Sequence, residues 1–150
     1  MTLLDAPSYD PRTYNMVRRG IIIFLILAVV GAAAAWWFWT WPEEHRVNRF
    51  MQAVEAGDLA KAYGMWYGDP AWQQHPQKYS AYDFGKFQED WGPGGNYGKI
   101  TSHKILMSKT FGNGVIVGLD INGGKTPLFL RVNPKTKEIG FSPDELYIGP

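Results

Sequence analysis

The chain has 150 residues, of which 45% are hydrophobic and 15% aromatic, and its formal net charge is +1. This length accommodates one domain of ordinary size together with a membrane anchor. After Trp41, twelve Lys and Arg residues balance twelve Asp and Glu residues, so we expect no binding to nucleic acid. The lack of cysteine excludes disulfides, thiolate metal sites and a cysteine nucleophile.

An uncharged apolar segment of 22 residues runs from Gly20 to Trp41. As a helix it would be about 33 Å long, enough to cross a hydrocarbon core of about 30 Å. It predicts one transmembrane helix, 20–41, between a cytoplasmic tail, 1–19, and a domain, 42–150. Indole side chains typical of a membrane–water interface lie near its C-terminal end: Trp36, Trp37, Trp39 and Trp41.

The charged residues that flank this segment predict its orientation. Arg18 and Arg19 precede it, whereas Glu43 and Glu44 follow it. Because cytoplasmic flanks carry an excess of Lys and Arg, we expect a bacterial-type inner membrane protein with a cytoplasmic N-terminus and a periplasmic domain. The alternative is a signal peptide cleaved at the alanines 33–35. The apolar run continues through tryptophans beyond that point, which favours an uncleaved anchor.

Small residues form a stripe within the predicted membrane helix, at i, i+3, i+4 and i+7: Ala28, Gly31, Ala32 and Ala35. In lipid, helices associate through close backbone packing, which small residues at this spacing permit. The stripe therefore predicts a second transmembrane helix as partner, in another subunit or in a second copy of the chain. The alternative is that alanine is simply common in membrane helices.

Helical spacing of apolar residues predicts three helices in the first half of the domain, around 47–54, 59–66 and 84–91. We expect Gly57 to end the first helix, because glycine readily adopts the left-handed conformation. Asp58 is placed to cap the second helix, and Ser80 or Asp83 the third. Residues 68–79 are expected to form a loop.

Alternating apolar residues predict strands in the second half, at 105–107, 115–121, 128–132 and from 139. Asn122-Gly123 is typical of a hairpin turn. Three helices followed by a meander of three or four antiparallel strands predict an α+β domain, with the helices on one face of a curved sheet.

The segment Phe50–Tyr63 has the form F-x-x-A-x-x-x-G-D-x-x-x-A-Y. This segment resembles the opening of NTF2-like domains, and the resemblance extends over about residues 43–148. It implies helices packed on a strongly bent antiparallel sheet. The superfamily includes enzymes, ligand binders and structural modules, so the resemblance supports a fold and assigns no function.

Few residues suggest catalysis or metal binding. His103 and Asp120, on predicted strands, are candidate bases, although we expect His103 to face solvent. His45 and His75 lack the partners at i+3 or i+4 that a metal site would use, so we predict no metal and no cofactor. The glycine-rich segment 92–98 lacks the Lys-Ser/Thr ending of a phosphate loop and is expected to be a linker.

Aromatic residues are the densest feature of the domain. Candidates for a docking surface or pocket are Tyr63, Trp66, Tyr67, Trp72, Tyr82 and Trp91. The alternative, which we favour, is that the aromatic residues form the core.

These features support three functional hypotheses. The leading one is a non-catalytic, single-pass accessory or assembly subunit of a larger membrane protein complex. The second is an anchored module that binds a small apolar ligand in the cone of the fold. The third is an enzyme of the ketosteroid-isomerase type, with Asp120 or His103 as base.

Overall fold

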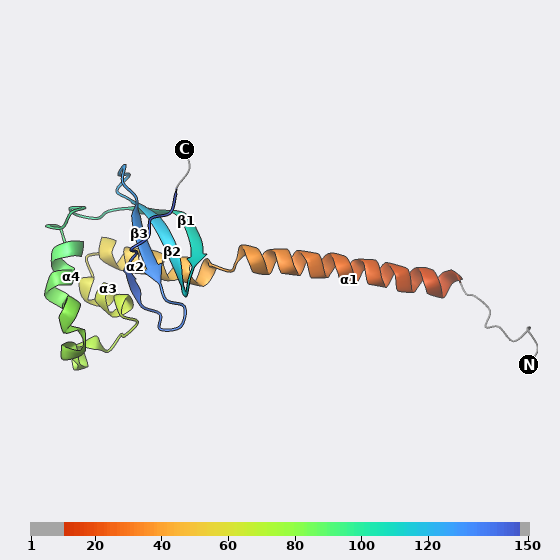
Figure 1. Ribbon diagram of the computed structural model, residues 1–150, viewed down its shortest axis with the longest axis horizontal. Coiled ribbons are helices and arrows are strands. Elements are labelled where there is room, and N and C mark those ends of the chain that lie inside the picture. Colours follow the sequence, from red (N-terminus) through yellow and green to blue (C-terminus); the bar gives the residue numbers. More distant parts are fainter. Residues whose placement is uncertain (1–10, 148–150) are drawn as a thin grey trace, which may run out of the picture. The chain divides into compact units, whose positions relative to one another are not determined.

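The computed structural model describes residues 11–147 of the chain. Those residues divide into two compact units, with the division between Trp39 and Thr40 (Figure 1). The first unit consists of the helix α1, Pro11–Trp37. The second contains the remaining helices, the sheet and the buried core.

Helix α1 begins and ends earlier than the apolar segment that predicted it. It begins nine residues before Gly20, because the charged residues at its start are compatible with helix and only unfavourable in lipid. It ends at Trp37, before a turn at 38–40. Pro42 explains the break, because a proline ring clashes with the carbonyl four residues earlier, here that of Phe38.

Three helices follow: α2, Trp41–Glu55, α3, Leu59–Trp66, and α4, Phe84–Trp91. The predicted caps are confirmed, because Asp58 accepts a hydrogen bond from the Lys61 amide and Asp83 accepts one from the Lys86 amide. Gly57 has a φ of +73° at the end of α2, as predicted. In Figure 1, α3 and α4 lie next to each other, beside the sheet.

The segment between α3 and α4 has more structure than the predicted loop. It contains two short 3-10 helices, η1, Trp72–Gln74, and η2, Pro76–Tyr82. Short 3-10 turns lack the long amphipathic period that identifies α-helices in sequence, which is why the pattern predicted a loop.

The four strands form one antiparallel sheet in the order β1-β2-β3-β4, as predicted: β1, His103–Phe111, β2, Gly114–Ile121, β3, Leu128–Val132, and β4, Ile139–Phe141. The register of β1 shifts between Ile105 and Met107. This bulge puts the two residues on opposite faces of the sheet, although their spacing predicted a shared face. Asn122 and Gly123 both have positive φ and form the expected turn.

The core lies between the sheet and the helices. Helix α2 contacts β1, β2 and β3, and α3 contacts β4. From the helices, Phe50 and Met51 are fully buried, as are Leu119 and Leu130 from the sheet. On the opposite face, Phe129 of β3 covers Gly118 of β2, whose missing side chain leaves room for the ring. The domain is therefore α+β, a small antiparallel sheet with helices packed against it.

Candidate functional site

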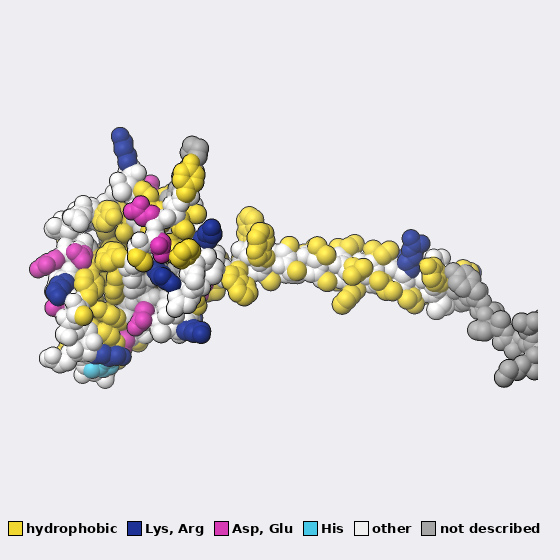
Figure 2. Space-filling view, viewed as in Figure 1, with side chains coloured by type: hydrophobic (Ala, Val, Ile, Leu, Met, Phe, Trp, Pro, Cys, Tyr) yellow, Lys and Arg dark blue, Asp and Glu magenta, His cyan; other side chains and the backbone are white. Residues whose placement is uncertain are grey.

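Helix α1 buries none of its residues in the described part of the chain. Its apolar side chains between Ile21 and Val30 are exposed, and Figure 2 shows hydrophobic groups along its visible length. By length and composition, α1 belongs to the one stretch of described helix that is apolar enough to cross a membrane. An unburied apolar surface of this extent is compatible with a helix that crosses a membrane.

The small-residue stripe lies within α1. A methyl group added at Gly31 would contact nothing within 4 Å, so nothing in the described chain packs there. The interfacial tryptophans lie at the end of α1 and just beyond it. Trp36 and Trp37 are in the last turn, Trp39 is in the following turn, and Trp41 begins α2; all four are exposed.

The aromatic candidates divide into buried and partly exposed residues. Tyr63, Trp66 and Trp91 are buried in the core, so they are excluded from any exposed docking surface. Edge-to-face contacts join Tyr63 to the rings of its neighbours, which are Tyr67, Trp72, Tyr79, Phe84 and Phe87. Tyr67, Trp72 and Tyr82 are only partly buried. Most of this group therefore stabilises the helical side of the domain.

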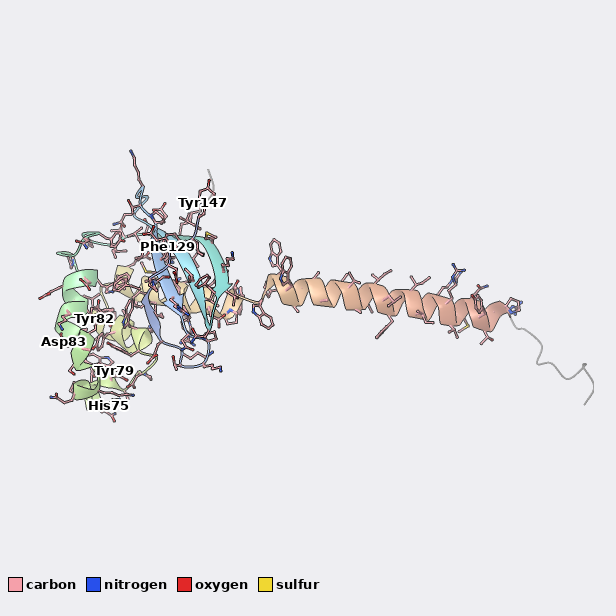
Figure 3. The ribbon with its side chains drawn as sticks, viewed as in Figure 1. His75, Tyr79, Tyr82, Asp83, Phe129 and Tyr147 are labelled. Carbon is pink, nitrogen blue, oxygen red and sulfur yellow. The ribbon has the colours of Figure 1, made fainter. Side chains whose placement is uncertain are left out.

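Four polar contacts fix the segment before α4. The Tyr63 and Tyr67 hydroxyls donate to the Tyr82 carbonyl, at 2.8 and 3.0 Å. Asp69 accepts a 2.6 Å hydrogen bond from the Tyr79 hydroxyl and lies 2.5 Å from His75 Nε2. Figure 3 shows His75, Tyr79 and Tyr82 in this segment. The Tyr79 hydrogen bond, helped by His75, lowers the pKa of Asp69.

His103 faces the helices and not solvent, which corrects the expectation from sequence. Its Nδ1 lies 2.6 Å from Glu55 Oε1 and its Nε2 lies 2.7 Å from Asn48 Oδ1, both on α2. Its side chain is only 8% exposed. The reason is strand parity, because His103 shares a face with Ile105, which packs on the core. Both ring nitrogens are occupied, so His103 connects β1 to α2.

Asp120 lies on the other face of the sheet. It is paired in register with Lys104, whereas His103 is paired with Ile121. One carboxylate oxygen, Oδ1, is buried without a hydrogen-bond partner in the described residues. Because the two candidate bases occupy opposite faces, they cannot act together on one substrate. Among the described residues, no three His, Asp or Glu side chains are grouped as metal ligands.

A cavity of about 470 Å³ opens on the helical side of the domain. Its cationic lining side chains are Arg46 and Arg49, three residues apart on α2, and Lys61 on α3; Trp72 supplies an aromatic wall. We call these four residues the cationic groove. Sequence analysis missed this site. Its only signal was the i, i+3 spacing of the arginines, because Lys61 and Trp72 join them only through the fold.

A second cavity, of about 320 Å³, lies where the end of α4 meets the sheet. Its apolar walls are Trp91, Tyr97, Leu128 and Phe141. Phe141 stacks on Trp91 with ring centroids 5.8 Å apart, yet remains 48% exposed. Two polar residues, Asp90 and Asn96, complete its lining.

No protein-family model, curated protein or solved structure matches this chain. The NTF2-like resemblance therefore stays a prediction.

Proposed function

We propose that the protein is a non-catalytic, single-pass membrane subunit that docks on a larger membrane protein complex. Helix α1 anchors it and packs against a transmembrane helix of the partner, and the α+β domain lies on the extracytoplasmic, periplasmic side of a bacterial-type inner membrane. We also propose that this domain is NTF2-like.

The observation that carries this proposal is the unburied apolar surface of α1. Nine Ile, Leu, Phe and Val residues lie between positions 21 and 30. At about 0.3–0.6 kcal/mol each, they favour insertion into a bilayer by about 3–5 kcal/mol. The open stripe around Gly31 offers the close approach that helix association in lipid needs.

Membrane anchoring and orientation are tested first. We expect the full chain to stay in the membrane fraction after carbonate extraction. A reporter active only outside the cytoplasm, fused after Pro150, should be active. Release of the chain by carbonate would contradict membrane anchoring. An inactive reporter would indicate that the domain lies on the cytoplasmic side.

The partner helix is tested by co-purification in mild detergent. The double variant Gly31→Leu/Ala32→Leu fills the stripe and should lose a stoichiometric membrane partner that the wild type retains. Ala33→Leu/Ala34→Leu is the matched control, because it adds nearly the same bulk away from the stripe. Equal recovery of the partner with both variants would exclude packing through the stripe.

A second candidate function is an anchored module that binds a small apolar ligand. The cavity beside Trp91 and Phe141 favours it, because four apolar side chains line a volume near the lower limit of known ligand sites. Titration of an apolar fluorescent dye should then give saturable binding that Leu128→Trp abolishes. Binding that is unchanged in this variant would exclude the cavity.

A further inference from the structure

The cationic groove concentrates positive charge in a domain whose formal net charge is zero. The residues that line it include Arg46, Arg49 and Lys61 and no Asp or Glu. The two ion pairs of the described residues both involve histidines, so none of these three cations lies within 4.0 Å of a carboxylate oxygen there. Like charges that line one cavity repel one another, and a bound anion would relieve this repulsion.

Apolar side chains line part of the groove, and Trp72 among them is held in place by a hydrogen bond and by packing. The Trp72 indole donates a 3.0 Å hydrogen bond to the Ala60 carbonyl, and its ring packs edge-on against Tyr63. Gly64 permits this arrangement, because a Cβ there would lie 3.3 Å from Trp72 Cδ1 and 3.1 Å from the Asp69 carbonyl oxygen. Met65 and Pro70 complete the apolar lining. A ligand with an uncharged portion beside its anionic group fits these walls.

We propose that the cationic groove binds a phosphate-bearing ligand. Three unpaired cations exceed what one carboxylate would neutralise, and they match a phosphate group, whose several oxygens accept paired hydrogen bonds from guanidinium groups. The volume of about 470 Å³ exceeds a bare phosphate and leaves room for an attached organic group along Trp72. In this proposal Arg46 and Arg49 bind the phosphate, and Lys61 contributes a third positive charge from α3.

The phosphate has two sources, a lipid headgroup or a soluble phosphate ester. Arg46 and Arg49 follow Trp41 by five and eight residues on one helix, which is about 8 and 12 Å along its axis. If α1 spans a membrane, as proposed above, the groove is therefore within reach of lipid headgroups. This choice of source rests on the proposed function, whereas phosphate binding itself does not.

The experiment uses the full chain in detergent and two probes. Native mass spectrometry counts bound phosphatidylglycerol, with phosphatidylcholine as the neutral comparison, and a ³¹P NMR titration measures glycerol 3-phosphate. We expect R46Q/R49Q to weaken binding of the phosphate probe at least about tenfold. K104Q/K109Q is the matched control, because it removes two exposed cations from β1, outside the groove, and should leave binding unchanged.

Each outcome is decisive. If R46Q/R49Q loses probe binding and K104Q/K109Q does not, the groove is supported as the binding site. Binding of only one of the two probes identifies the source of the phosphate. No binding to wild type, or equal losses in both variants, would overturn the proposal. If R46Q/R49Q unfolds, K61Q at an exposed position replaces it, and unchanged binding in K61Q would overturn the proposal too. R46Q/R49Q should remain in the membrane fraction, so failure of the groove and failure of the anchor are separate results.

Discussion

The ionisation of the Tyr63 side chain is coupled to the stability of the helical side of the domain. Burial raises the pKa of Tyr63 to about 12, from an ordinary value of 10.0. The neutral hydroxyl is thus favoured in the folded state, so its contribution is complete below pH 10 and is lost as pH rises from 10 to 12. We predict alkaline unfolding in this window, measured by denaturant titration at successive pH values in detergent.

Tyr63→Phe tests this at a single oxygen. At pH 7 the variant should lose only about 1 kcal/mol, because the Tyr82 carbonyl keeps its hydrogen bond from Tyr67. Above pH 10 its stability should fall less steeply than that of the wild type. Tyr147→Phe, at an exposed position, is the control and should match the wild type throughout. An unchanged alkaline slope in Tyr63→Phe would contradict the assignment.

Asp69 gives the opposite pH dependence. Its lowered pKa means that its hydrogen bonds with Tyr79 and His75 stabilise the fold above its ordinary pKa of 3.8. This contribution is lost as pH falls through the lowered value. We predict that Asp69→Asn is less stable than the wild type at pH 7 and that the difference shrinks below about pH 4. Parallel acid curves for the variant and the wild type would refute this.

At the scale of elements, the Asn122 side chain connects the end of β2 by hydrogen bonds to the segment that precedes β1. Its Oδ1 accepts hydrogen bonds from the Thr101 and Ser102 amides, and its Nδ2 donates to the Lys99 carbonyl. Its φ of +55° is unfavourable for most side chains. The residue therefore supplies both a turn conformation and a set of bonds between segments.

Two variants separate these contributions. Asn122→Gly keeps the positive φ and loses the bonds, and we predict a loss of about 1–2 kcal/mol in the free energy of unfolding. Asn122→Ala also loses the hydrogen bonds, and its side chain disfavours the positive φ. We therefore expect it to be about 1 kcal/mol less stable than Asn122→Gly. Chemical denaturation measures both values. Equal stability of the two variants would show that the backbone conformation contributes nothing.

At the scale of the whole molecule, the core depends only on residues after Trp39. Helix α1 contributes no buried residue. We predict that a fragment of residues 40–150 folds alone and that its Tm lies within about 4 °C of the full chain in detergent. Thermal unfolding followed by circular dichroism checks this. A fragment that fails to fold would mean that α1 stabilises the domain.

Local chemistry explains which features the sequence predicted. The caps at Asp58 and Asp83 and the turn at Asn122-Gly123 depend on residues within three positions of each other. Each strand of the meander shows an alternation of apolar residues that is visible within a few neighbouring positions. Such features can be read before the fold is known.

The features that sequence analysis missed depend on residues far apart in the chain. The bulge in β1 is a property of two paired strands, and it reversed the expected face of Met107. The contact between His103 and Glu55 joins positions 48 residues apart. The cationic groove combines α2, α3 and η1, and no spacing along the chain encodes that combination.

The turn between α1 and α2 limits how far the domain can travel. Only residues 38–40 separate the two helices, so Trp37 and Trp41 can be at most about 14 Å apart. A short tether turns the second contact with a shared partner into an intramolecular step, at effective concentrations in the millimolar range. Two individually weak contacts, one through α1 and one through the domain, would then hold a partner firmly, and lengthening the turn with a flexible insert would weaken that hold without altering either surface.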